Sequence, residues 1–160
     1  MKKIYFSTSL KGQNADPALG HQVVTYLQQL GHTVLSEHVG ARTSAELQAL
    51  FAQNSGVDQT GMDATAKARV IRMADMRWVD EADVLVAVIT GASLGVGMEI
   101  ERALLKPERG LPVTSIYCFV AEECFQGLSA MVQGVAEQNF HLFRFGTFSD
   151  IQEQLAELLQ

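Results

Sequence analysis

The stretch Asp83–Ile89, with the sequence DVLVAVI, is apolar at every position after its first residue. An uninterrupted apolar run of this length is typical of a strand that is covered on both faces, as strands are in parallel sheets. Parallel strands need a crossover connection, which is usually a helix. The run therefore predicts an α/β fold in which strands and helices alternate.

The rest of the chain shows that alternation. Further strands are predicted at Lys3–Thr8, Thr33–His38, Val113–Val120 and Phe140–Phe145. The predicted helices run from Asp16-Pro17 to about Leu30, before Gly31, and then over Asp63–Val79, Gly97–Leu105 and Leu128–Ala136. A last helix is expected after a capping box of Ser149 and Gln152, with a core face of Ile151, Leu155, Leu158 and Leu159. Residues 40–62 are polar, with a short helical pattern at Ala45–Phe51. Together these elements predict a single-domain, three-layer flavodoxin/Rossmann-like fold over residues 1–160, with a five-stranded parallel sheet.

Charge and cysteine content narrow the class of partner. The net charge is −6 and the basic residues are scattered, which argues against a nucleic-acid polymer or an anionic membrane as the main partner. No apolar run is long enough to span a bilayer, and the N-terminus does not resemble a signal peptide, so we expect a cytoplasmic protein. Cys118 and Cys124 form neither a disulfide framework nor a metal cluster. His21, His32 and His141 show no metal-ligand spacing, and we expect no metal and no cofactor.

Ligands of open parallel sheets bind beyond the carboxyl ends of the strands, near the point where the strand order reverses. The segments that follow the predicted strands are rich in hydroxyl groups and glycine. They are Ser7–Gly12, Ser36–His38, Thr90–Glu99 and Gln126–Met131. Polar and small residues on one rim of an apolar sheet indicate a pocket for a polar, phosphorylated small molecule.

The segment from Ser93 to Glu99 is the most informative of these. Gly95 and Gly97 are expected to allow a tight turn close to a ligand, although the turn could equally serve only to pack a helix on the sheet. Glu99 is expected in the first turn of the next helix, where the helix dipole favours the ionised carboxylate of a nucleophile. An ordinary helix-start residue is the alternative.

Other single residues have two readings as well. Lys11 could bind a phosphate or be a solvated loop lysine, and His38 could face a base or be an ordinary hydrogen-bonded histidine. Trp78 is expected in the core. Met73, Met76 and Met131 are also expected to pack in the interior.

Several segments together resemble the 2′-deoxynucleoside 5′-phosphate N-hydrolase branch of the nucleoside 2-deoxyribosyltransferase superfamily. The segments are Ile4–Gly12 (IYFSTSLKG), Leu35–Val39 (LSEHV), Trp78–Ala87 (WVDEADVLVA), Ser93–Glu99 (SLGVGME) and Leu128–Gly134 (LSAMVQG). They follow the order of that family and span nearly the whole chain apart from about residues 40–65. The resemblance implies a flavodoxin-like fold and a homodimer whose active sites are shared between subunits.

The resemblance also implies roles for individual residues. Glu99 matches the carboxylate that attacks the anomeric carbon, Asp75 the second catalytic carboxylate, and Tyr5 the tyrosine that holds the nucleophile. Residues that match the 5′-phosphate loop are Ser9, Lys11, Gly12 and Ser93, with Gly95 and Gly97 in the same glycine-rich turn. Glu37 and His38 match a segment close to the base. Ser129 matches a phosphate ligand from the partner subunit, in the segment that also holds Met131.

The expected reaction is hydrolysis of the N-glycosidic bond of 2′-deoxynucleoside 5′-monophosphates through a covalent glycosyl-enzyme intermediate. Three departures from the pattern leave alternatives open. Lys11 stands where an arginine is usual, Ser7-Thr8 replaces Cys-Gly, and the stretch between Val39 and Asp75 is longer. The alternatives are a deoxyribosyltransferase acting on nucleosides, a ribonucleotide N-glycosidase of the CMP type, and a non-catalytic nucleotide-binding module.

Overall fold

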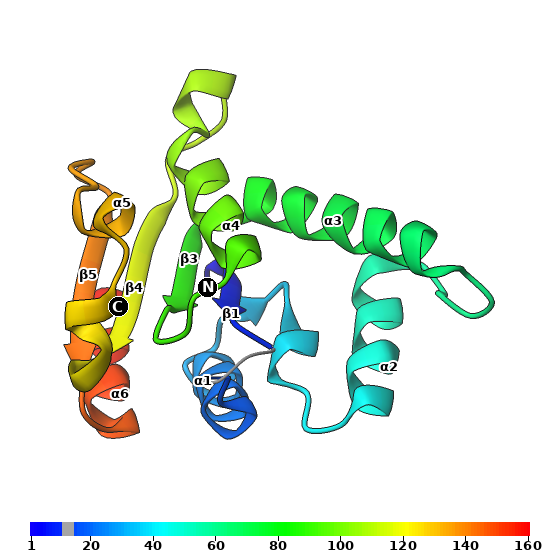
Figure 1. The fold of residues 1–160 in the computed structure, drawn as a ribbon, viewed down its shortest axis with the longest axis horizontal. Helices are drawn as coiled ribbons and strands as arrows, with labels where there is room; N and C mark the ends of the chain where they lie inside the picture. Colours follow the sequence, from blue (N-terminus) through cyan, green and yellow to red (C-terminus); the bar gives the residue numbers. More distant parts are fainter. Residues whose placement is uncertain (11–14) are drawn as a thin grey trace.

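The computed structural model describes residues 1–10 and 15–160, and it places five parallel strands in one sheet with the order β2-β1-β3-β4-β5 (Figure 1). The strands are β1 (Lys3–Thr8), β2 (Thr33–Val34), β3 (Val84–Val88), β4 (Ser115–Ala121) and β5 (Phe140–Phe145). This order confirms the predicted flavodoxin-like α/β class. The order reverses between β1 and β3, so the carboxyl ends of these two strands mark the expected binding crevice.

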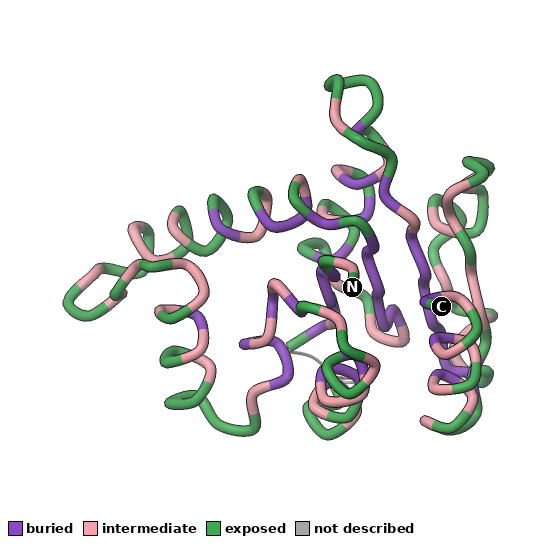
Figure 2. Tube along the Cα trace, turned by 180° about the vertical axis from the view of Figure 1, so that it is seen from behind, coloured by how far each residue is buried: buried purple, intermediate pink, exposed green. Residues whose placement is uncertain are grey.

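Helices lie on both faces of the sheet. The helices are α1 (Pro17–Gln29), α2 (Ser44–Ser55), α3 (Ala64–Glu81), α4 (Leu94–Leu104), α5 (Ala130–Gln133) and α6 (Phe148–Leu158). Short 3₁₀ turns occupy Glu37–Gly40 (η1), Pro107–Arg109 (η2) and Glu122–Gly127 (η3). Helices α1 and α6 pack on one face, and α3 and α4 pack on the other. Figure 2 shows β1, β3 and β4 largely buried between them, whereas α2 and the first half of α3 extend to the side with much of their surface exposed. None of the described helices has both the length and the apolar character needed to cross a bilayer.

The alternation of side chains along each strand decides which residues can meet. Ile4 and Phe6 of β1 join the core under α1 and α6, and Tyr5 joins the core under α3 and α4. Because successive strand residues point to opposite faces, Ser7 shares the face of Tyr5. The sequence of β1 thus turns two hydroxyl groups toward α3 and α4.

The predicted strand Thr33–His38 is wrong beyond Val34. The Ser36 hydroxyl accepts a hydrogen bond from the Phe6 amide at 2.8 Å and donates one to the Phe6 carbonyl at 2.7 Å. A fully buried side chain thus occupies the ladder positions on β1 that a longer β2 would have used. The backbone is released from the sheet and forms η1.

Three predicted helix boundaries also differ. Helix α4 begins at Leu94 instead of Gly97, because the Ser93 hydroxyl caps it by accepting from the Val96 amide. The helix predicted over Leu128–Ala136 is only the short α5, which Ser129 caps and which ends at Gly134. The last helix is capped by Thr147 with Asp150, and not by Ser149 with Gln152, since the Asp150 carboxylate accepts from the Gly146 and Thr147 amides.

The structure confirms some of the predicted core residues and contradicts others. Trp78 is buried, as expected, and Cys118 is a buried free thiol. Ile151, Leu155 and Leu159 of the last helix are buried. The expectation that Met73 and Met131 pack in the interior is wrong, because they are 72% and 84% exposed.

We predict that Ser36→Ala destabilises the fold by about 1–3 kcal/mol, because it leaves two buried backbone groups of Phe6 without a partner. The free energy of unfolding from urea titration is the measurement, and Ser149→Ala, at an exposed position, is the control. Equal stability of the two variants would contradict the role given to Ser36.

Candidate active site

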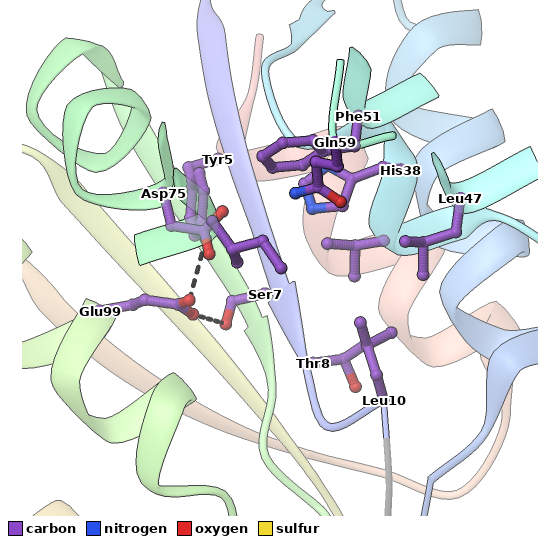
Figure 3. Close-up of a pocket in the computed structure, with 12 residues that line it drawn as sticks. Tyr5, Ser7, Thr8, Leu10, His38, Leu47, Phe51, Gln59, Asp75 and Glu99 are labelled. Carbon is purple, nitrogen blue, oxygen red and sulfur yellow. Dashed lines mark hydrogen bonds between the residues drawn. The ribbon is translucent and has the colours of Figure 1, made fainter. Parts of the chain in front are cut away.

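A cavity of about 130 Å³ lies at the carboxyl end of β1 (Figure 3). It is lined by Tyr5, Ser7, Thr8, Leu10, His38, Val39, Leu47, Phe51, Gln59, Ile71, Asp75 and Glu99. Its walls come from β1, η1, α2, α3 and α4 and from the loop between α2 and α3. The cavity is therefore at the reversal of strand order, where open parallel sheets bind their ligands.

The Glu99 carboxylate is held by two hydroxyl groups of β1. Tyr5 donates to Oε1 at 2.9 Å, and Ser7 donates to Oε2. Burial raises the pKa of Glu99, and these two hydrogen bonds oppose that rise by stabilising the ionised form. The prediction that Glu99 lies in the first turn is wrong: α4 begins at Leu94, so Glu99 is in the second turn. The helix dipole acts mainly within the first turn, so the hydroxyl groups replace it as the support for this carboxylate.

Asp75 approaches the same cavity from α3. Burial, followed by the negative charge of Glu99, raises the pKa of Asp75 to about 7, against a smaller lowering by the Tyr5 hydroxyl. Its Oδ1 atom is buried and has no hydrogen-bond partner. A carboxyl group with this pKa is present in both protonation states near neutral pH, as a general acid and base requires. The two carboxyl groups thus differ in environment, which is how acid and nucleophile roles are separated in such pairs.

Tyr5 and Ser7 are the residues that fix Glu99. Burial and the two nearby carboxylates raise the pKa of Tyr5 well above its ordinary value, so the hydroxyl stays a neutral donor. Tyr5 was expected here from the family resemblance, but Ser7 was not assigned a site role. Ser7 could have been predicted from its position two residues after Tyr5, because a polar residue there lies on the same face of an otherwise apolar strand.

The opposite end of the cavity is neutral and largely apolar. His38 is 5% exposed, and its ring packs against Phe51 and Trp78 with centroid distances of 5.3 and 5.4 Å. Burial lowers the pKa of His38 to about 4, so the imidazole is neutral at physiological pH. The neighbouring Glu37 is not among the lining residues, and its carboxylate accepts a hydrogen bond from the Gln28 amide of α1 at 2.6 Å.

None of the predicted phosphate residues that the structure describes lines this cavity. Ser9 is buried just after β1, and Lys11 and Gly12 fall outside the described residues. Gly95 and Gly97 belong to the first turns of α4 and have no positive φ, which corrects the expected tight glycine turn. A Cβ at Gly97 would meet no atom within 4 Å, so these glycines leave the start of α4 open to solvent.

A wide groove runs along the outer side of α4. Its volume is about 840 Å³, and it lies between α4 and the segment that contains α5. Ser93 and Gly97 line it from one side, and Ser129 and Met131 from the other. None of these four residues lines the carboxylate cavity. In one chain, therefore, Ser129 and Met131 are not brought to Asp75 and Glu99.

The part of the chain that the structure describes contains no group of three or more histidine, cysteine or acidic residues suited to a metal ion.

Known proteins resemble this chain in sequence. Residues 4–122 match the family model of nucleoside 2-deoxyribosyltransferase. The chain is 37% identical to the 5-hydroxymethyl-dUMP N-hydrolase of Homo sapiens over 134 residues, which is 84% of this chain and 66% of the human protein. It is 31% identical to the protein of the same name from Tetraodon nigroviridis, covering 97% of this chain and 95% of that one. A putative 2′-deoxynucleoside 5′-phosphate N-hydrolase of Thermofilum pendens is 30% identical over 98% of this chain and 92% of its own length.

Solved structures share the fold. The CMP N-glycosidase of Clostridium botulinum superposes with a TM-score of 0.59 at 13% identity, covering 97% of this chain and 99% of that one. A 2-deoxyribosyltransferase of Bacillus psychrosaccharolyticus gives a TM-score of 0.55 at 15% identity, covering 94% and 90% of the two chains. At these identities the likeness concerns the fold.

We predict that stability falls as the pH rises through the window set by Asp75. Its pKa is raised from 3.8 to about 7, so within that interval the folded chain keeps a proton that the unfolded chain has released. Folding then binds a proton, and the free energy of unfolding falls with rising pH across the interval. Asp75→Asn should flatten this fall, and the raised pKa of Glu99 accounts for a remaining slope of the same sign.

Urea titrations at several pH values between about 4 and 8 measure this slope. Glu101→Gln is the control, because Glu101 lies two residues from Glu99 on α4 but is exposed. An unchanged slope in Asp75→Asn would contradict the protonation assigned to Asp75.

Proposed function

Because this chain belongs to the nucleoside 2-deoxyribosyltransferase family, we propose that its carboxylate cavity hydrolyses the N-glycosidic bond of 2′-deoxynucleoside 5′-monophosphates. The chain is an enzyme of the deoxynucleotide N-hydrolase, or N-glycosidase, type. The observation that carries the proposal is the pair of partly buried carboxyl groups in one cavity, with Glu99 held by Tyr5 and Ser7. The products are a free base and 2-deoxyribose 5-phosphate.

In the first proposed step, the Glu99 carboxylate attacks the anomeric carbon of the deoxyribose. The bond between this carbon and the base nitrogen breaks, and its electron pair goes to the nitrogen. Asp75, protonated in part near neutral pH, gives its proton to the departing base. The oxocarbenium-like transition state carries positive charge, which the adjacent Glu99 carboxylate stabilises.

In the second proposed step, water attacks the anomeric carbon of the glycosyl-enzyme intermediate and Glu99 leaves as a carboxylate. Asp75 is now deprotonated and takes the proton of the water, so each group returns to its starting state. The hydrogen bonds from Tyr5 and Ser7 orient the Glu99 carboxylate toward the anomeric carbon. They also lower the cost of burying its charge before the substrate arrives.

The site is proposed to be completed by a second copy of the chain. Large apolar side chains are exposed along the groove, including Leu94 at 91%, Met98 at 51% and Met131 at 84%. An exposed apolar patch of this kind marks an interface. The family resemblance implies that, in a twofold dimer, Ser129 of one subunit reaches the start of α4 of the other, where the 5′-phosphate is proposed to bind.

We predict that Glu99→Gln leaves the fold nearly intact and lowers turnover by several orders of magnitude. The amide keeps the size of the side chain, but it neither attacks the anomeric carbon nor stabilises positive charge. The measurements are base release by chromatography and thermal unfolding on the same preparation, with Glu153→Gln, at an exposed position of α6, as the matched control. Near-normal turnover of Glu99→Gln would rule out covalent catalysis by this residue.

We predict that Ser129→Ala lowers use of a deoxynucleoside monophosphate by roughly 1–3 kcal/mol of transition-state stabilisation, with little effect on the unphosphorylated nucleoside. Mixed with Glu99→Gln chains under conditions that allow subunit exchange, it should regain activity. Each mixed dimer then contains one site with both an intact Glu99 and an intact Ser129, so random exchange restores about a quarter of the sites.

Light scattering should give a dimer at the assay concentration. If the mixture of Ser129→Ala and Glu99→Gln chains gained no activity after subunit exchange, or if a monomer were fully active, a site shared between subunits would be contradicted.

A further inference from the structure

The carboxylate cavity contains buried polar atoms that no protein group satisfies. In the described part of the chain, four buried side-chain nitrogen or oxygen atoms have no hydrogen-bond partner, and three of them belong to residues that line this cavity: His38 Nδ1, Gln59 Nε2 and Asp75 Oδ1. A buried polar group without a partner destabilises a fold, so each such atom calls for a partner from outside the chain, such as water or a ligand, or for a functional reason. The Asp75 atom belongs to the carboxyl pair already described. His38 and Gln59 remain to be explained.

These two side chains lie at the neutral end of the cavity. Figure 3 shows Asp75 and Glu99 at one end, and His38 and Gln59 at the other, beside Phe51. His38 is fixed by ring contacts with Phe51 and Trp78, and burial keeps its imidazole neutral by lowering its pKa to about 4. The Gln59 amide carries no charge at any pH. With Leu47 as an apolar wall, this end offers flat apolar contact and neutral hydrogen-bonding groups, which suits a nucleobase better than a phosphate.

Gln59 lies outside the segments that carry the family resemblance in the sequence. It lies between α2 and α3, in the stretch of about residues 40–65 that the family resemblance does not cover. Its buried Nε2 is a donor, so the base has to supply an acceptor at that point. A carbonyl oxygen fits this requirement, whereas an exocyclic amino group would bring a second donor against the first.

We propose that Gln59 selects the base, by donating a hydrogen bond from Nε2 to the exocyclic carbonyl oxygen of an oxo-substituted base in the wall formed with His38. The enzyme accordingly prefers 4-oxopyrimidine and 6-oxopurine deoxynucleotides to their amino counterparts. This inference rests on the proposed function. It concerns a specificity-determining residue that sits apart from Glu99 and Asp75.

The test compares kcat/KM for two matched pairs of substrates, dUMP against dCMP and dIMP against dAMP. The wild type should favour the oxo member of each pair. Gln59→Met keeps the length of the side chain and removes the hydrogen bond, so the preference should fall by about tenfold, the effect of one neutral hydrogen bond. Gln59→Glu presents only acceptors and should shift the preference toward dCMP and dAMP. Gln48→Met, at an exposed position of α2, should leave both ratios unchanged.

Thermal unfolding separates recognition from folding. Gln59→Met removes an unsatisfied buried amide, so its melting temperature should equal or exceed that of the wild type. Equal wild-type rates for oxo and amino substrates, or a ratio in Gln59→Met within about twofold of the wild-type ratio, would overturn the inference and leave the proposed function standing. Absence of base release from all four nucleotides would overturn the proposed function and the inference together.

Discussion

The buried carboxylate of Glu99 is the group on which the geometry of the cavity depends. An ionised carboxylate in a buried place is costly unless hydrogen bonds replace its lost hydration. Tyr5 and Ser7 supply those bonds only because both point to the α3 and α4 face of β1. Their register is fixed by the pairing of Tyr5 with Leu85 and of Ser7 with Ala87 on β3. A slip of one residue would turn both hydroxyl groups toward α1 and α6, so the sheet register and the site are one constraint.

The relative position of the two carboxyl groups depends on how α3 and α4 are joined. Asp80 of α3 accepts hydrogen bonds from Arg102 of α4, at 3.0 Å from Nε, and from Arg109 of η2 at 2.7 Å. Close by, the buried Lys106 donates to the Ala82 carbonyl at 2.8 Å. These contacts tie the ends of the two helices together, away from the cavity. They stabilise the pair of helices that carries the two carboxyl groups. This stabilisation offsets the cost of Asp75, whose raised pKa and unpartnered oxygen oppose folding.

The sequence predicts the fold class well because apolar periodicity and helix-start signals are local. It fails where a single side chain redirects the backbone. The Ser36 hydroxyl ends β2, and the Ser93 cap moves the start of α4, which takes Glu99 out of the first turn. The positions that follow the strands include Glu99 but not Asp75. Asp75 lies inside a helix, and only the family resemblance assigns it a role. Gln59 is indicated by neither the strand ends nor the resemblance, because it lies in a connection between two helices and only folding brings it to the cavity that His38 also lines.

The position of Glu99 along α4 also explains how a site with two carboxyl groups can accept an anionic substrate. Glu99 lies six positions after Ser93, which corresponds to about 9 Å along a helix axis. In the proposed complex, the phosphate lies at the start of α4, where free amide groups and the helix dipole favour an anion, and where Gly95 and Gly97 leave room. The deoxyribose then bridges toward Glu99 and the base extends to His38 and Gln59. Helix α4 thereby keeps the phosphate of the substrate apart from the Glu99 carboxylate, although its first residues face the one and its second turn carries the other.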